Sequence, residues 1–207
     1  MYRIKHNCEH LLEIEKSKFI TYLFIIDSED DAKSYIKDIR KLHPNANHHC
    51  YAYICGNNDE ITRSNDDKEP SGTAGVPILE CLKLNKMSNI LSIVVRYFGG
   101  IKLGAGGLIR AYSKSTSLAL KSIPHMLLVE KYKYNISFSY DLIKKIEYIF
   151  ASNNISVINK EYNDDNVSYT YLSLIDQFTS SLNELSSGKC TPTFIETVLI
   201  EQEVIND

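Results

Sequence analysis

Five of the nine glycines in this chain fall within nine residues, directly after an apolar run and before a helical pattern. The apolar run, residues 90–95, is typical of a buried strand. Backbone N–H groups in a glycine-rich turn between a strand and a helix can approach an anion at the positive end of the helix. The sequence therefore predicts an anion-binding turn made by the glycines of this block, which are Gly99, Gly100, Gly104, Gly106 and Gly107.

No known nucleotide-binding motif fits these glycines. A dinucleotide fingerprint that starts at Gly104 and Gly106 would need its third glycine where Ile109 stands. A P-loop that starts at Gly99 would need its lysine where Ala105 stands. Glycines also permit positive φ angles and close packing of a strand against a helix, so a packing role is the alternative to an anion site.

Cations follow the glycine turn at helical spacing. Arg110, Lys114 and Lys121 fall in one stripe at about 100° per residue, and no acidic residue occurs between Glu80 and Glu130. A one-signed stretch of this length indicates an anionic partner, although an ordinary solvated face is the alternative.

Two aromatic residues, Tyr97 and Phe98, directly precede the glycines of this block. They could stack on nucleic-acid bases or pack in the core beside the strand. We therefore take as candidate anion- or nucleic-acid-binding residues Arg96, Tyr97, Lys102, Gly104, Gly106, Gly107, Arg110, Lys114 and Lys121.

A second block, DDKEPSGTAGVP at residues 66–77, combines carboxylates with another helix start. Its three carboxylates could hold a hard cation or exchange protons, although carboxylates in a loop are usually only solvated. Its serine and threonine are typical N-caps for the following helix, and the backbone of residues 72–75 offers a further set of N–H groups. The second candidate loop comprises Asp66, Asp67, Glu69, Ser71, Gly72, Thr73 and Gly75.

The five cysteines and six histidines show no metal-ligand or catalytic spacing. Cys50 and Cys55 have the wrong spacing for a zinc knuckle, and His48 and His49 point to opposite faces of a regular strand. His48 and Cys50 share one face, but apolar residues share it too, which indicates a buried and inert thiol. We predict no catalytic residue, no metal and no cofactor.

Hydrophobic periodicity predicts the elements that position these blocks. Ser28 precedes an acidic first turn, and basic residues come before Pro44, which is the charge order that a helix dipole favours. The first part of the chain is then two strands within 9–26, a helix from 28 to 43, an alternating strand at 48–54, a loop or edge hairpin at 56–69, a helix from about 75, a strand at 90–95 and a helix from Leu108 to Pro124.

The second part of the chain has predicted strands and helices in the order βαββαβ. This order indicates a ferredoxin-like domain, so we expect an α+β protein with domains at 1–126 and 127–207. The predicted elements are strands at 130–139, 155–162, 166–175 and 191–201 and helices at 141–152 and 176–187.

Composition and charge limit the classes of function. The chain is 43% hydrophobic and 24% charged, as in ordinary globular proteins, and no apolar run approaches the about 20 residues of a membrane helix. Scattered cysteines in odd number and the absence of a secretory signal indicate a cytoplasmic protein without a membrane partner. Residues 129–207 hold 6 basic and 12 acidic residues, so this acidic domain could dock a protein partner.

Three blocks together resemble the IMPACT/YigZ family in order and spacing. They are HHCYAY (48–53), DDKEPSGTAG (66–75) and VVRYFGGIKLGAGGLIRAY (94–112). The resemblance implies an N-terminal domain similar to domain IV of elongation factor G, a ribosomal-protein-type α/β fold, and a second domain similar to that factor's domain V. It also implies a link to translation, because the eukaryotic member restrains an amino-acid-starvation kinase through a shared scaffold protein.

Two positions differ from the family pattern. Lys68 stands where glycine is usual, and Val76 stands where members commonly carry Lys or Arg. The missing cation at Val76 favours the surface from Arg96 to Lys121 over the acidic loop as the anion site. The expected function is a non-enzymatic, RNA- or ribosome-associated role linked to the regulation of translation.

Two other functions are weighed against this one. The first is an enzyme that acts on a small phosphorylated metabolite or nucleotide, with phosphate at Gly104–Gly107 and a metal or proton held by the carboxylates of the acidic block. The second is a protein-interaction module that docks through the acidic C-terminal domain.

Overall fold

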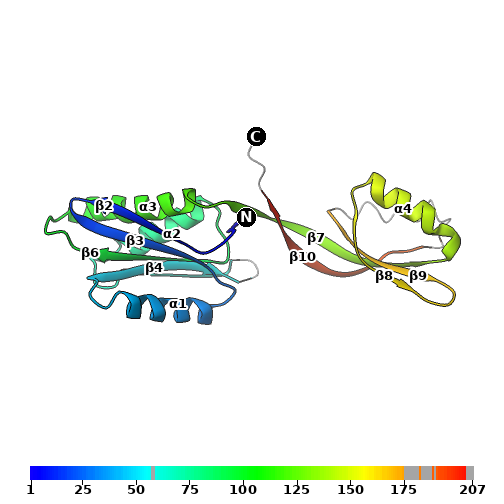
Figure 1. Ribbon diagram of the computed structural model, residues 1–207, viewed down its shortest axis with the longest axis horizontal. Helices are drawn as coiled ribbons and strands as arrows, with labels where there is room; N and C mark the ends of the chain where they lie inside the picture. The colour runs from blue at the N-terminus through cyan, green and yellow to red at the C-terminus, as the bar shows by residue number, and fades with distance from the viewer. Residues whose placement is uncertain (57–58, 175–181, 183–187, 189, 204–207) are drawn as a thin grey trace. The chain divides into compact units, whose positions relative to one another are not determined.

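The chain has a mixed α/β architecture of the expected α+β class, and it forms two compact units (Figure 1). The computed structural model describes residues 1–56, 59–174, 182, 188 and 190–203. One unit comprises residues 1–128 and the described residues after 200, and the other comprises residues 129–200. Within these described residues, none of the helices has the length and apolar character needed to cross a membrane.

A five-stranded antiparallel sheet with helices on both faces forms the first unit. Figure 1 shows α2 and α3 over one face and α1 over the other. The strands, in spatial order, are β2 (Cys8–Ile14), β3 (Ser17–Ile25), β6 (Ile90–Tyr97), β4 (His48–Cys55) and β5 (Ile61–Asn65). The helices are α1 (Glu29–Leu42), α2 (Gly75–Leu84) and α3 (Gly104–Lys121).

The alternation predicted for β4 is confirmed. Cys50, Ala52 and Ile54 pack in the core beneath α2 and α3, whereas Tyr53 belongs to the core on the α1 side. The central strand β6 is buried on both faces from Ile90 onward, which explains its continuous apolar sequence.

The start of α1 also follows from its sequence. Ser28 Oγ accepts the backbone N–H of Asp31 at 3.2 Å, and the Asp31 carboxylate accepts the N–H of Ser28 at 3.0 Å. This reciprocal capping box satisfies two of the N–H groups that a helix leaves unpaired.

The prediction that the third helix begins at Leu108 was wrong, because α3 begins at Gly104. Glycine has a low helix propensity, but packing in a protein overrides so weak a preference. Gly104 has a φ of +67°, a conformation that side chains disfavour. Gly99 has a packing role, since a Cβ there would lie 2.0 Å from the carbonyl carbon of Lys16 in the β2–β3 turn.

Strand β7 (His125–Phe138) begins five residues before the predicted strand at 130. Its first residues pair with β1 (Tyr2–Ile4), a strand that we did not predict, in the register Tyr2 with Leu127. The long-range pairing therefore extends β7 beyond what its own periodicity indicates.

The second unit has the strand order β10–β7–β9–β8, which is the order of a ferredoxin-like sheet. The predicted helix at 176–187 lies outside the described residues, apart from residue 182. The described elements are β7, the 3-10 helix η1 (Tyr140–Leu142), α4 (Ile143–Ser152), β8 (Ser156–Tyr162), β9 (Val167–Ser173) and β10 (Thr193–Glu203).

Candidate functional site

A cleft of about 630 Å³ lies beside the first turns of α3, and we call it the α3 cleft. Three segments form it: the β2–β3 turn, the chain between β6 and α3, and α3 itself. The residues that line the α3 cleft are Ile14, Glu15, Ile101, Lys102, Leu103, Gly107, Arg110, Ala111 and Lys114.

Three of the predicted cations meet in the α3 cleft. Lys102, Arg110 and Lys114 are exposed, and within the described part of the chain none of them forms an ion pair or a side-chain hydrogen bond. Glu15 is the one acidic residue among the cleft-lining residues. With three cations and one carboxylate among its described lining residues, the cleft therefore has an excess of positive charge.

The N-terminus of α3 opens beside these cations. Its N-cap is Leu103, which has no side chain able to accept an N–H group of the first turn. A Cβ added at Gly106 would lie 3.5 Å from Arg110 Nη1, so the guanidinium group folds back over that turn. The positive end of the helix dipole and the Arg110 charge thus act on the same space.

Five of the predicted residues are not among those that line this cleft: Gly104 and Gly106 of the first turn of α3, and Arg96, Tyr97 and Lys121. Arg96 is 4% exposed and its guanidinium Nη1 donates to Glu69 Oε1 at 2.6 Å. Tyr97 points to the opposite sheet face, as the neighbour of Arg96 on a strand must, and its hydroxyl lies 2.9 Å from His43 Nδ1. Lys121 lies in the last turn of α3, where its charge lowers the pKa of Cys81 against the larger effect of burial.

The three sequence blocks meet around the carboxylate of Glu69, which is 4% exposed. Besides Arg96, the Tyr112 hydroxyl of α3 donates to Glu69 Oε1 at 2.8 Å, and His48 Nε2 of β4 lies 3.7 Å from the same oxygen. The Arg96 guanidinium also lies 5.3 Å from the ring centroid of Phe19. Glu69 is thus neither a solvated carboxylate nor an exposed acid or base, because it neutralises a buried guanidinium.

The Cys50 thiol belongs to the same buried cluster. It donates to the Asp66 carbonyl at 3.0 Å and lies 3.3 Å from the Tyr112 hydroxyl. Burial raises the pKa of Cys50 strongly, and burial also raises the pKa of Tyr112. The prediction that this thiol is buried is therefore confirmed, and a raised pKa keeps the thiol in its less nucleophilic protonated form.

Asp66 occupies the N–H groups of the second candidate loop. Its Oδ1 accepts from the backbone of Ala74 at 3.0 Å and Gly75 at 2.8 Å, and its Oδ2 accepts from Gly72 at 2.8 Å. This carboxylate lies where a bound anion would lie at the N-terminus of α2. In this structure the loop therefore does not offer its N–H groups to an external phosphate.

The expected capping of α2 by Ser71 or Thr73 was wrong. The N-cap is Ala74, which forms no side-chain cap, and the Thr73 hydroxyl donates to the Pro70 carbonyl at 2.6 Å. Ser71 is exposed. Asp66 caps the helix instead from outside the turn, since its chain segment folds back over the first N–H groups.

Asp67 is held between two elements. It accepts the backbone N–H of His49 at 2.7 Å and the guanidinium of Arg40 at 2.8 Å. Burial opposes ionisation, but these two donors hold the pKa of Asp67 below its usual value. Among the residues described, no three or more His, Cys, Asp or Glu side chains are grouped to hold a metal.

The two departures from the family pattern have different structural settings. Lys68 has a φ of +71°, in the left-handed region that glycine adopts without steric cost. Val76 is 48% exposed in the first turn of α2.

A second groove was missed in the sequence. It lies between α1 and β4, on the sheet face opposite the α3 cleft, and four basic residues of α1 and Tyr51 of β4 line it. The lysines at 33, 37 and 41 recur every four residues, a signal that could have been read as one helix face. The position of Tyr51 beside these lysines could not be predicted, because Tyr51 belongs to β4 and the lysines belong to α1.

Comparison with known proteins places this chain in a family. The Impact N-terminal domain matches residues 15–120, and a Domain of unknown function (DUF1949) matches residues 136–189. A crystal structure of a hypothetical protein has a TM-score of 0.61 and 31% identity, and the match covers 94% of this chain and 97% of the other.

Two bacterial relatives share the same family name. The IMPACT family member YvyE of Bacillus subtilis (strain 168) is 40% identical, over 98% of this chain and 94% of its own length. The IMPACT family member YigZ of Escherichia coli (strain K12) is 37% identical, over 72% of this chain and 74% of its own length. With the three blocks assembled around Glu69, this chain belongs to the IMPACT family.

Proposed function

We propose that this protein binds RNA, alone or within the ribosome, through the α3 cleft, in a role linked to translation. One observation carries the proposal: Lys102, Arg110 and Lys114 converge on one cleft without an ion-pair partner in the described residues. Cations without internal partners can pair with the phosphates of a polyanion without first breaking ion pairs within the protein.

The residues of the α3 cleft favour contact with the sugar–phosphate backbone. None of the described residues that line it is aromatic, so they provide no platform on which a base could stack. Positive charge and open N–H groups at a helix N-terminus suit phosphate, and such contacts carry no base specificity. We therefore infer binding to folded RNA, in which the phosphates form the accessible surface.

An enzyme acting on a small phosphorylated compound is a second candidate. The volume of the cleft, about 630 Å³, is within the range of small-molecule sites. However, Asp66, Asp67 and Glu69, which this function would use for a metal or a proton, are engaged in internal contacts and do not line the cleft. A thermal-shift panel of nucleotides and phosphometabolites with Mg²⁺ tests this candidate, and a flat panel rejects it.

The RNA proposal is tested by salt-dependent binding to a labelled RNA hairpin. Each phosphate contact that a variant loses reduces the slope of log K against log salt by about 0.7 to 0.9. We expect the Arg110→Glu/Lys114→Glu double variant to bind at least about tenfold more weakly than the parent at low salt, with a smaller slope. Co-sedimentation of the same variant with ribosomes extends the test to the ribosome.

The matched control is Lys83→Glu/Lys86→Glu, which makes the same change in charge in the last turn of α2 and just after it, outside the α3 cleft. This variant should retain most of the affinity for RNA, because dissolved salt screens the interaction between the RNA and charges that lie far from the binding site. Equal binding by the parent and the Arg110→Glu/Lys114→Glu variant at every salt concentration would contradict the proposal.

A further inference from the structure

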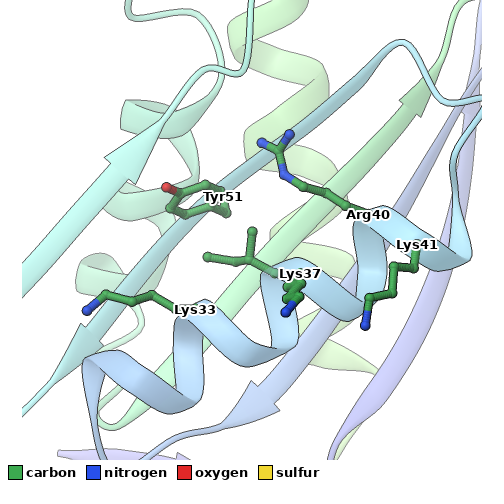
Figure 2. A pocket seen from close by; sticks show the side chains of 6 residues that line it. Lys33, Lys37, Arg40, Lys41 and Tyr51 are labelled. Carbon is green, nitrogen blue, oxygen red and sulfur yellow. The ribbon is translucent and has the colours of Figure 1, made fainter.

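A groove of about 530 Å³ separates α1 from β4, and we call it the α1 groove. Figure 2 shows the Tyr51 ring facing α1, with Lys33 and Arg40 on either side of it in this view. The lining residues are Lys33, Ile36, Lys37, Arg40, Lys41 and Tyr51, and no acidic residue is among them.

The lysines form a row along α1. Lys33, Lys37 and Lys41 are each four residues apart, so they rise by about 6 Å per step along the helix axis. That step is comparable with the separation of adjacent phosphates in an extended polynucleotide strand. The row therefore matches the repeat of a single strand as well as its charge.

The charges of the α1 groove are available to a ligand. Lys37 has no ion-pair or hydrogen-bonding partner among the described side chains. Lys33 and Lys41 pair with Asp30 and Asp38, but all four side chains are more than 60% exposed, and such surface pairs contribute little. Arg40 differs, because Asp67, 14% exposed, fixes its guanidinium at the end of the row.

The floor of the groove is apolar and includes the aromatic ring of Tyr51. The Tyr51 ring lies parallel to that of Tyr53, with an interplanar angle of 7° and 6.3 Å between centroids. The Tyr53 hydroxyl donates to Glu29 Oε1 at 2.6 Å, and this hydrogen bond fixes the Tyr53 ring beside that of Tyr51. Ile36 and the aliphatic parts of the lysines complete the floor.

We propose that the α1 groove binds single-stranded nucleic acid, with a base stacked on Tyr51 and phosphates along Lys33, Lys37 and Lys41. An aromatic platform beside a row of cations is the combination that single-strand binding needs. The proposal rests on the proposed function only for its class of ligand, since it concerns another surface, on the opposite face of the sheet. An acidic peptide would use the cations but gain no stacking from Tyr51.

The test compares two labelled probes: an oligonucleotide of about eight nucleotides and its abasic counterpart of equal length and charge. Tyr51→Leu should lower the affinity for the oligonucleotide at least about fivefold and leave the abasic probe unchanged, because only stacking is lost. Tyr51→Phe, which keeps an aromatic ring, should bind both probes as the parent does. The unfolding midpoint of each variant verifies that it is folded.

A second variant tests the cations independently of Tyr51. Lys37→Glu should weaken binding of both probes and reduce the salt slope, whereas Lys83→Glu on α2 should not. Because Lys37 is exposed, this variant keeps its fold even if Tyr51→Leu does not.

The two proposals fail in different ways. Parent-like binding of the oligonucleotide by Tyr51→Leu and Lys37→Glu overturns the inference, even when Arg110→Glu/Lys114→Glu has lost the RNA hairpin. Loss of the oligonucleotide by the α1-groove variants sustains the inference, even when hairpin binding does not depend on the α3 cleft. Displacement by an oligoglutamate as effective as unlabelled oligonucleotide of equal charge also overturns the inference, in favour of an acidic peptide.

Discussion

The N-termini of α2 and α3 are both rich in glycine, but, as far as the structure describes the chain, only the N-terminus of α2 is occupied by a carboxylate of the protein itself. At α2, the Asp66 carboxylate accepts three backbone N–H groups and fills the site from within. At α3, the N-cap Leu103 offers no acceptor, and Lys102, Arg110 and Lys114 surround an open cleft. The same local chemistry thus stabilises the fold at one helix and leaves charge for a ligand at the other.

The difference shows that a glycine-rich helix N-terminus is a candidate anion site only when no side chain of the protein already accepts its N–H groups. Carboxylates in the block at 66–69 are engaged by backbone, arginine or tyrosine donors. The cations of the α3 cleft have no such partners in the described chain. We therefore expect substitutions in the acidic block to act on stability and substitutions in the cleft to act on binding.

The largest expected effect is at Glu69. Glu69→Gln leaves the Arg96 guanidinium buried without its countercharge, which should lower the free energy of unfolding by about 3–5 kcal/mol in chemical denaturation. Arg110→Gln in the cleft should change it by less than about 0.5 kcal/mol, because this side chain is exposed. A comparable loss in both variants would contradict the division between the two regions.

At Asp66, the filled helix N-terminus can be opened. Asp66→Ala removes the acceptor of three N–H groups and should cost about 1–3 kcal/mol of unfolding free energy. Added phosphate should then raise the melting temperature of this variant more than that of the parent, since the ion replaces the lost carboxylate. Ser71→Ala, at an exposed position of the same loop, is the control and should resemble the parent.

Acid should weaken the same block through Asp67. Because the folded-state pKa of Asp67 lies below its ordinary value of 3.8, its contribution to stability is complete above that pH and is lost as the pH falls through the folded-state pKa. Asp67→Asn should remove this part of the acid sensitivity in unfolding midpoints measured against pH. Arg40→Gln should move the loss to higher pH, and an unchanged acid limb in both variants would refute the assignment.

The smallest expected effect is a gain. Lys68→Gly should relieve a left-handed backbone that costs a side chain about 1–2 kcal/mol, against about 0.5–1 kcal/mol for the greater freedom of unfolded glycine. A net stabilisation of up to about 1.5 kcal/mol should result, measured by chemical denaturation. Lys68→Ala keeps the Cβ and should show no gain, so equal stabilisation by both variants would rule out backbone strain as the cause.

Local signals made much of the fold predictable. The acidic first turn after Ser28 predicted α1, and alternation from Cys50 to Ile54 predicted both faces of β4. The start of α3 was placed too late, because glycines at 104–107 are typical of loops when the packing around them is not considered. β1 was missed because three residues have no periodicity, and their partner strand is more than 120 residues away.

The candidate site was predictable only in part. The cations at 102, 110 and 114 were found because they are close in sequence and lie near one end of α3. The partner of Arg96 was not found, since Glu69 stands 27 residues earlier and no local pattern joins them. For the same reason Asp66 could not be recognised as the cap of a helix that begins at Gly75.

The pairing of β1 with β7 sets an order of events during synthesis of the chain. Tyr2, Arg3 and Ile4 are made before their strand partners Leu127, Met126 and His125, which stand more than 120 residues later in the chain. The ribosome must therefore release more than 120 further residues before this edge of the first unit can close. Until then β1 lacks its partner strand, and an unpaired strand that carries an apolar side chain such as Ile4, 1% exposed in the finished fold, makes the partly made chain prone to aggregate.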